Sequence, residues 1–191
     1  MRCCRPPERL ACEHRMVNDP AAIMGPIRRG YTLPIRGTHG VVHCARVLEN
    51  GLRIADRNGA DRLFITLFAL FHDARRVNEN YDPGHGERGA ELAKSLRGTL
   101  VHLDDAQFAL LAEACRLHSD GLTVGRPTVQ ACWDADRVDL GRVGNKPLPQ
   151  RLCTDAARGL LAWAHARAVS GHVPAAVLDA WGAGAGTIGG D

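Results

Sequence analysis

Apolar residues recur at the spacing of a helix face through most of this chain, and this periodicity limits the folds that the chain can adopt. Phe64, Leu67, Phe68 and Phe71 stand at positions i, i+3, i+4 and i+7, which places them on one side of a helix. No segment alternates convincingly between apolar and polar residues at period two, as a half-buried strand would. The sequence therefore predicts an all-α protein.

The same periodicity predicts six to seven helices in a single domain, a size that suits 191 residues. Residues 1–35 hold many of the prolines and are expected to form a loosely ordered N-terminal arm. Residues 36–181 are expected to form the helical domain, and the Gly/Ala-rich residues 182–191 a flexible tail. The expected helices cover residues 42–58, 61–73, 87–96, 105–118, 127–143, 152–169 and 174–181.

Composition excludes several classes of protein. The 24 basic residues are scattered and the net charge is only +3, so the nucleic-acid footprint of a basic stripe is missing. The longest apolar run, residues 63–71, is far shorter than the roughly 18 residues of a membrane span. The seven cysteines are irregularly spaced and the N-terminus is too polar for a secretory signal, so a reduced, cytoplasmic protein is expected. Cys3, Cys4 and Cys12 do not match the usual spacing of zinc ligands.

The informative feature is a series of His and Asp residues, most of them close to the ends of the expected helices. His43 opens one helix, His72 and Asp73 end the next, and Asp136 lies in a later helix. Alone, the pair His72-Asp73 is an ordinary helix C-terminus, where the helix dipole favours an imidazole. The order of the whole series, with 29 residues from His43 to His72, is more specific.

This order resembles the HD phosphohydrolase superfamily, in which an apolar-apolar-His-Asp segment such as 70–73 ends a helix. The resemblance covers roughly residues 36–145. It implies a helical bundle and a divalent metal held by four side chains. On this resemblance the ligands are His43, His72, Asp73 and Asp136.

Two further histidines extend the resemblance. His85 stands at the start of the third expected helix and His118 at the end of the fourth. Some HD proteins carry two such histidines and bind a second metal, in which case Asp73 would bridge two ions about 3.5–4 Å apart. The alternative is that His85 is a surface residue and His118 only a helix cap. His39, four residues before His43, is either a loop residue or a group beside the site.

The chemistry of this ligand set is consistent with catalysis by one or two metal ions. Imidazole and carboxylate together suit Mn, Fe, Co, Ni or Zn better than Ca. A water bound to such a metal loses a proton near neutral pH and becomes a nucleophile. Arg46 and Arg76 are the arginines expected to contact phosphoryl oxygens, with a solvated face as the alternative for each, and Lys146 is a weaker candidate. Asp73 or Glu87 is expected to orient the water.

The leading expectation is therefore a hydrolase of a phosphomonoester or phosphoanhydride, with a small phosphorylated substrate such as a nucleotide. A di-iron oxygenase on the same scaffold is one alternative, although the 13 residues from His72 to His85 are closer to the hydrolase type. A non-catalytic binding or regulatory protein is another. A helical surface bearing Trp133, Trp163 or Trp181 would allow a homodimer.

Overall fold

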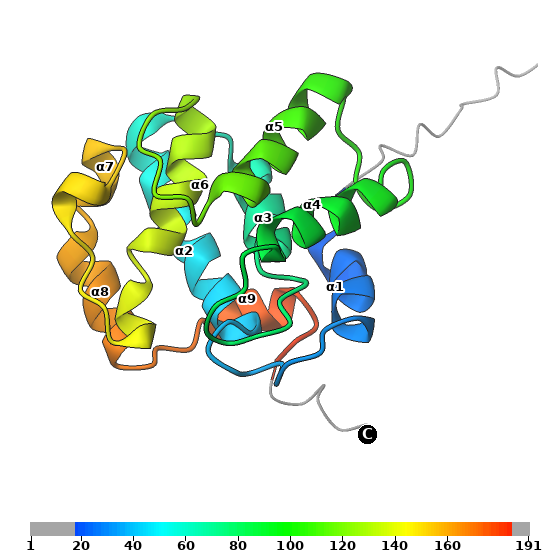
Figure 1. Ribbon diagram of the computed structural model, residues 1–191, viewed down its shortest axis with the longest axis horizontal. Coiled ribbons are helices and arrows are strands. Elements are labelled where there is room, and N and C mark those ends of the chain that lie inside the picture. Colours follow the sequence, from blue (N-terminus) through cyan, green and yellow to red (C-terminus); the bar gives the residue numbers. More distant parts are fainter. Residues whose placement is uncertain (1–17, 185–191) are drawn as a thin grey trace, which may run out of the picture.

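A computed structural model describes residues 18–184, and within them the protein is all-helical and has no β-strand. The expected fold class is confirmed (Figure 1). The helices, including two short 3-10 helices labelled η, are α1 (Pro20–Arg29), α2 (Val41–Asn58), α3 (Arg62–Phe71), α4 (His85–Ser95), α5 (Asp105–Leu117), α6 (Pro127–Arg137), η1 (Leu140–Val143), η2 (Pro149–Arg151), α7 (Asp155–Arg158), α8 (Leu161–Val169) and α9 (Ala175–Ala180).

The helix α3 is the centre of the fold. It contacts α1, α2, α4, α5 and α6, and Figure 1 shows these helices around it. Seven of its ten residues are buried, including Phe64, Phe68 and Phe71. The apolar face that predicts this helix is therefore covered on several sides, which fixes the position of the residues at its C-terminal end.

Helix boundaries in this region follow from capping side chains. Asp61 precedes α3 and accepts a hydrogen bond from the backbone N–H of Phe64 at 3.0 Å. Asp104 precedes α5 and forms a capping box with Gln107, in which each side chain binds the other residue's backbone N–H. Gly59 ends α2 with φ 74°, a left-handed conformation that favours glycine.

The N-terminal region differs from the expectation of a loosely ordered arm over residues 1–35. Residues 20–29 form α1, which Asp19 caps through its side chain and which has Pro20 in its first turn. The helix buries three apolar side chains in the core: Ile23, Met24 and Ile27. It is thus part of the domain, while residues 1–17 lie outside the described region.

Two expected helices are broken in the structure. The expected helix 127–143 ends at Arg137, and η1 follows because Gly141 lies close to α8, where an added Cβ would lie 2.7 Å from His165 Nδ1. The expected helix 152–169 is divided at Gly159 into α7 and α8. Of the expected tail, residues 182–184 are described, and Ala183 among them is buried.

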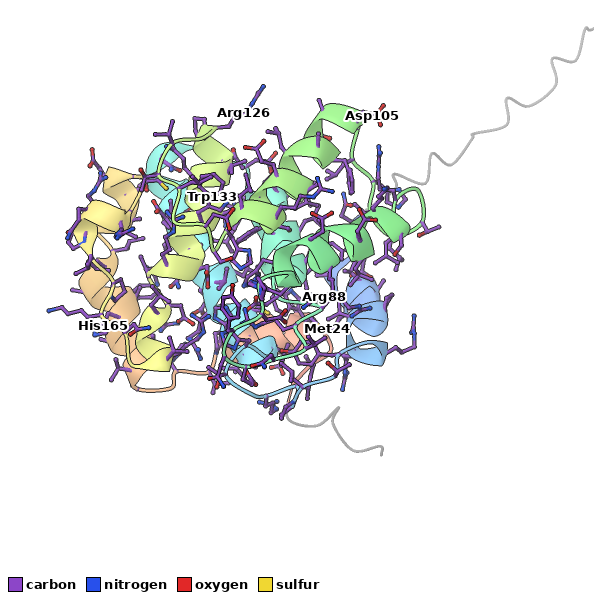
Figure 2. The ribbon with its side chains drawn as sticks, viewed as in Figure 1. Met24, Arg88, Asp105, Arg126, Trp133 and His165 are labelled. Carbon is purple, nitrogen blue, oxygen red and sulfur yellow. The ribbon has the colours of Figure 1, made fainter. Side chains whose placement is uncertain are left out.

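The tryptophans are not arranged as an exposed surface. Trp133 and Trp181 are only 1% and 2% exposed, and in Figure 2 Trp133 lies among the helices whereas Arg126 projects outward. Trp163 is half-buried, and the guanidinium groups of two arginines lie over its ring. The structure therefore gives no support to a dimer surface built on Trp133 or Trp181.

Candidate metal centre

The structure brings the six His and Asp residues singled out in the sequence into one cluster. They come from five helices that are far apart in the chain, and every one of them is buried. The cluster consists of His43 on α2, His72 and Asp73 at the end of α3, His85 at the start of α4, His118 at the end of α5, and Asp136 on α6.

Asp73 lies between two sets of ligands. Its Oδ2 atom is 3.6 Å from His43 Nε2 and 3.7 Å from His72 Nε2. Its Oδ1 atom is 3.4 Å from His85 Nε2 and 3.7 Å from His118 Nε2. Asp136 Oδ1 is 3.3 Å from His43 Nε2. We call His43, His72 and Asp136 the first group, and His85 and His118 the second group; each group shares Asp73.

Three of the four histidines are oriented by backbone carbonyls. His72 Nδ1 lies 3.2 Å from the carbonyl oxygen of Phe68, and His118 Nδ1 lies 2.7 Å from that of Cys115. His85 Nδ1 contacts the carbonyl oxygen of Asp82. A carbonyl oxygen only accepts hydrogen bonds, so each Nδ1 carries a proton, and in the neutral ring Nε2 then has the free lone pair. These lone pairs are directed at Asp73.

His43 is oriented instead by a carboxylate, Asp139. Its Nδ1 lies 2.8 Å from Asp139 Oδ2, and Arg46 donates two hydrogen bonds to the same carboxylate at 2.8 and 3.1 Å. A carboxylate behind a ligating histidine fixes the ring and raises its basicity. Sequence reasoning assigned no role to Asp139. Its position three residues after Asp136 in a predicted helix was the available signal, because that spacing shares a face.

The arrangement fits divalent metal ions. The Nε2 atoms of His43 and His72 lie 3.2 Å apart, and those of His85 and His118 lie 2.9 Å apart. Two nitrogen lone pairs this close repel each other unless a cation or a proton lies between them. Among the described residues, Asp136 Oδ1 is buried without a hydrogen-bond partner. Imidazole nitrogen with carboxylate oxygen is a ligand set for a divalent transition metal.

Burial sets the charge state of these side chains. Burial lowers the pKa of His72 to about 3 and also lowers that of His85, so both rings are neutral and able to ligate at neutral pH. Burial acts to raise the pKa of Asp73, but the neighbouring imidazoles outweigh it and keep that carboxyl ionised. Burial acts to lower the pKa of His118, but contacts with Asp73 and Asp136 outweigh it and raise that pKa.

Two glycines allow α4 to approach the centre. A Cβ atom at Gly86 would lie 2.2 Å from the carbonyl oxygen of Cys115, and one at Gly89 would lie 2.2 Å from that of Phe71. The helix can therefore lie directly against α5 and the end of α3, which is how His85 reaches Asp73. These are the glycines that follow His85 in the sequence.

Comparison with known proteins agrees with this fold. A solved structure matches with a TM-score of 0.61 and 28% identity, over 78% of this chain and 86% of the other. It is the 1.45 Å crystal structure of a predicted HD superfamily hydrolase from an uncultured Thermotogales bacterium. The chain has the fold and the ligand pattern of the HD superfamily. No family model and no curated protein matches the sequence.

We call the cluster of six His and Asp residues the HD centre. The two arginines expected to contact phosphoryl oxygens have other partners beside it. Arg46 uses its three guanidinium nitrogens on Asp139 and on the carbonyl oxygen of His172. Arg76 donates to Asp73 Oδ1 at 3.3 Å and to two carbonyl oxygens of the loop after α3. Both hold ligands or their supports in place. Glu87, the alternative to Asp73 for orienting water, is half-exposed and bound to Arg116.

Arg142 on η1 is a charged neighbour of the HD centre that the sequence did not reveal. Its side chain is 7% exposed, with Nη2 3.6 Å from Asp136 Oδ1 and Nη1 3.8 Å from Asp139 Oδ2. Its Nε has no hydrogen-bond partner in the part of the chain that the structure describes. The positive charge of the guanidinium therefore balances the carboxylates of Asp136 and Asp139. Its Nε–H group can still donate a hydrogen bond to another acceptor.

His39 lies at the edge of the first group. Its ring centroid is 6.1 Å from that of His43, and its Nδ1 is 2.6 Å from Glu79 Oε2. His39 was expected to be either a loop residue or a group beside the site. It lies beside the ligand His43 and is paired with the carboxylate of Glu79.

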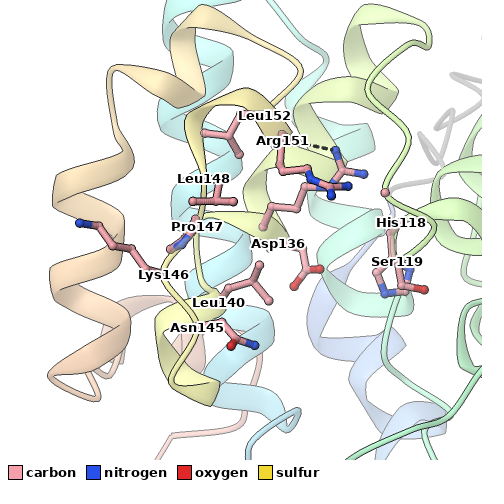
Figure 3. A pocket seen from close by; sticks show the side chains of 12 residues that line it. His118, Ser119, Asp136, Leu140, Asn145, Lys146, Pro147, Leu148, Arg151 and Leu152 are labelled. Carbon is pink, nitrogen blue, oxygen red and sulfur yellow. Dashed lines mark hydrogen bonds between the residues drawn. The ribbon is translucent and has the colours of Figure 1, made fainter.

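A pocket of about 450 Å³ opens beside the HD centre (Figure 3). Asp136 of the first group and His118 of the second group both line it, so both halves of the centre border one cavity. Apolar side chains of η1 and the segment after it form much of the wall: Leu140, Pro147, Leu148 and Leu152. None of the helices in residues 18–184 is long and apolar enough to cross a membrane.

Proposed function

We propose that the protein is a metal-dependent HD hydrolase that cleaves a phosphomonoester or phosphoanhydride with two divalent ions. The observation that carries this proposal is the position of Asp73, whose two carboxylate oxygens face two separate pairs of histidines. A carboxylate shared in this way would hold two ions close together, as in the sites where a pair of ions acts on one phosphoester. The similarity to a protein described as an HD superfamily hydrolase supports the same reaction type.

Each residue of the centre has a distinct task in this proposal. His43, His72 and Asp136 would hold one ion, His85 and His118 the other, and Asp73 both. When bound, the ions supply a Lewis acid and lower the pKa of a coordinated water. Asp139 and Arg46 keep the His43 ring in its ligating orientation. Buried Arg142 adds positive charge next to Asp136, where the negative charge of a phosphoryl group would increase.

The pocket gives the substrate its direction of approach. Since Asp136 and His118 lie on its wall, a phosphoryl group placed between them is reached from this cavity. The remainder of the substrate would then lie along Leu140, Pro147 and Leu148. A cavity of about 450 Å³ is in the size range of small-molecule sites, as a nucleotide-sized substrate needs.

Metal analysis of the purified protein, combined with phosphoester hydrolysis in the presence of Mn or Fe, tests the proposal. We expect the wild type to bind two ions per chain and to turn over substrate. In His72→Ala and in His118→Ala, the metal content and the turnover should both be lower. His102→Ala, in the loop before α5, is the matched control and should retain both. A chain that binds no metal under any loading condition would refute the proposal. Turnover that requires O2 would assign the centre to the oxygenase class instead.

A further inference from the structure

The pocket beside the metal centre has an unbalanced charge. Three of its lining side chains are cationic, namely Arg137, Lys146 and Arg151, and Asp136 is the one acid among them. Asp136 belongs to the first group and would be neutralised by an ion held there. Within residues 18–184 neither Arg137 nor Arg151 forms an ion pair with a carboxylate. The positive charge of this wall is therefore left for a ligand.

Arg137 is the more informative of the two because it is buried. Only 8% of the residue is exposed, and its guanidinium lies 5.7 Å from the ring of Trp133. Its Nη1 donates to neutral acceptors, the carbonyl oxygen of Arg151 at 3.2 Å and the thiol sulfur of Cys153 at 3.3 Å. Its Nη2 is buried and has no hydrogen-bond partner among residues 18–184. An unpaired buried cation is costly, so this group is suited to an incoming anion.

Arg151 extends the same wall. In Figure 3 it lies between Leu152 and His118, on the side of the pocket that faces the metal ligands, while Lys146 directs its side chain to the opposite side. The apolar residues Leu140 and Leu148 line the pocket as well. The pocket thus combines metal ligands, an apolar wall and an arginine pair. It is also much larger than one phosphoryl group.

We infer that Arg137 and Arg151 form a subsite for a second anionic group of the substrate, so that the protein selects phosphoesters that carry another phosphate or a carboxylate. This inference rests on the proposed function, because it takes the first phosphoryl group to lie at the metal ions. Arginine is the side chain that binds either anion with two parallel N–H donors. Hydrogen bonds to charged groups are strong enough to change affinity by about tenfold or more.

Binding of non-hydrolysable phosphonates to the metal-loaded full-length protein tests the subsite without any turnover. For a given spacer length, isothermal titration calorimetry would compare three ligands: an alkylphosphonate, the phosphonate with a terminal carboxylate, and the bisphosphonate. Spacers of two to five carbons vary the distance between the two anionic groups. We expect the wild type to bind at least one doubly anionic ligand about tenfold more tightly than the alkylphosphonate of the same length, and the carboxylate and phosphonate arms identify which anion it is.

Variants locate the effect. Arg151→Gln should abolish the preference and leave alkylphosphonate binding within about twofold, whereas Arg126→Gln, an exposed arginine at the start of α6, should change neither. Arg137→Lys, which keeps the charge but loses the fork, should reduce the preference. Equal binding of all three ligands at every spacer length, or an equal loss for all three in Arg151→Gln, would overturn the inference. Failure of the proposed function appears separately, as a metal-loaded protein that hydrolyses no phosphoester.

Discussion

The two halves of the metal centre are built in different ways. In the first group, His43 is held by the carboxylate of Asp139, 96 residues away, and Arg46 on the same helix as His43 binds that carboxylate and the carbonyl oxygen of His172. In the second group, His85 and His118 are held by backbone carbonyls only three residues away, those of Asp82 and Cys115. In the first group His72 is also held by a backbone carbonyl, that of Phe68, so the dependence on tertiary contacts between side chains is specific to His43. The second group depends on where whole helices lie.

This difference predicts which substitutions each half tolerates. The first group should respond to changes in side chains that never touch a metal. The second group should respond to changes in the helix packing that places α4 against α5 and the end of α3. Asp73 belongs to both halves, so its loss should affect the binding of both ions.

The largest effect is expected at Asp73. In Asp73→Ala both groups lose their shared carboxylate, so metal content should fall for both ions. Hydrolysis should decrease by more than the roughly 10–100-fold that is typical when a residue behind a ligand is changed. His118→Ala should lose one ion and keep the other. Metal analysis by mass spectrometry checks both variants, and equal metal loss in the two would contradict the division into groups.

Gly89→Ala is expected to have the next largest effect. The new Cβ would lie 2.2 Å from the carbonyl oxygen of Phe71, and backbone cannot move as a flexible side chain would. We expect the free energy of unfolding to fall by about 3 kcal/mol, the upper end for overpacking, together with loss of the ion in the second group. Gly25→Ala in α1, which has only ordinary contacts, is the control and should stabilise by up to about 1 kcal/mol. Urea unfolding measures both; a Gly89→Ala protein as stable as the wild type would rule out the close approach.

Asp139→Asn should weaken the first group specifically. Asparagine retains the shape of the side chain but removes the charge that faces His43 Nδ1 and Arg46. We expect a 10–100-fold loss of affinity for one ion, about 1.4–2.7 kcal/mol, with the other ion retained. Competition with a chelator of known affinity gives both constants. Asp105→Asn, an exposed acid at the start of α5, is the control. Equal weakening of both ions would show that the two halves are not independently supported.

The smallest effect is expected at Arg75, which follows Asp73 closely but serves neither group. It donates to the carbonyl oxygens of Pro26 and Ile27 and so ties α1 to the loop after α3. Arg75→Gln should lower the free energy of unfolding by about 1 kcal/mol, and turnover should stay within about twofold. Unfolding curves and steady-state kinetics test this together. A folded variant without activity would give Arg75 a role at the centre.

Sequence patterns were informative where one element decides the outcome. The phenylalanines of α3 indicate a buried helix whichever neighbours cover it, and the spacing of the His and Asp residues predicts a cluster that the fold does assemble. The segment Asp19-Pro20 also carried a helix-start signal, a capping side chain followed by a first-turn proline, although the proline-rich surroundings obscured it.

Patterns were uninformative where two distant segments decide the outcome. Arg46 was expected at the substrate, but its partner Asp139 lies 93 residues away and becomes its neighbour only in the folded protein. No sequence pattern around Arg142 indicates its role. The 3-10 helix η1 brings its guanidinium close to Asp136 only in the folded protein. No sequence pattern assigns Arg137 to a pocket wall, and its Nη2, which has no hydrogen-bond partner among residues 18–184, is recognised only in the folded protein.

The position of Trp133 makes the pocket visible to spectroscopy. Its indole is almost fully buried, its Nε1 donates to the carbonyl oxygen of Ala114, and the Arg137 guanidinium lies near its ring. A fixed indole of this kind emits at short wavelength, and its emission is sensitive to charge close to the ring. Neutralisation of Arg137 by an anion therefore changes the intrinsic fluorescence of the protein. Binding of a ligand in the pocket can therefore be detected by the change in tryptophan fluorescence, without a label and before any reaction is known.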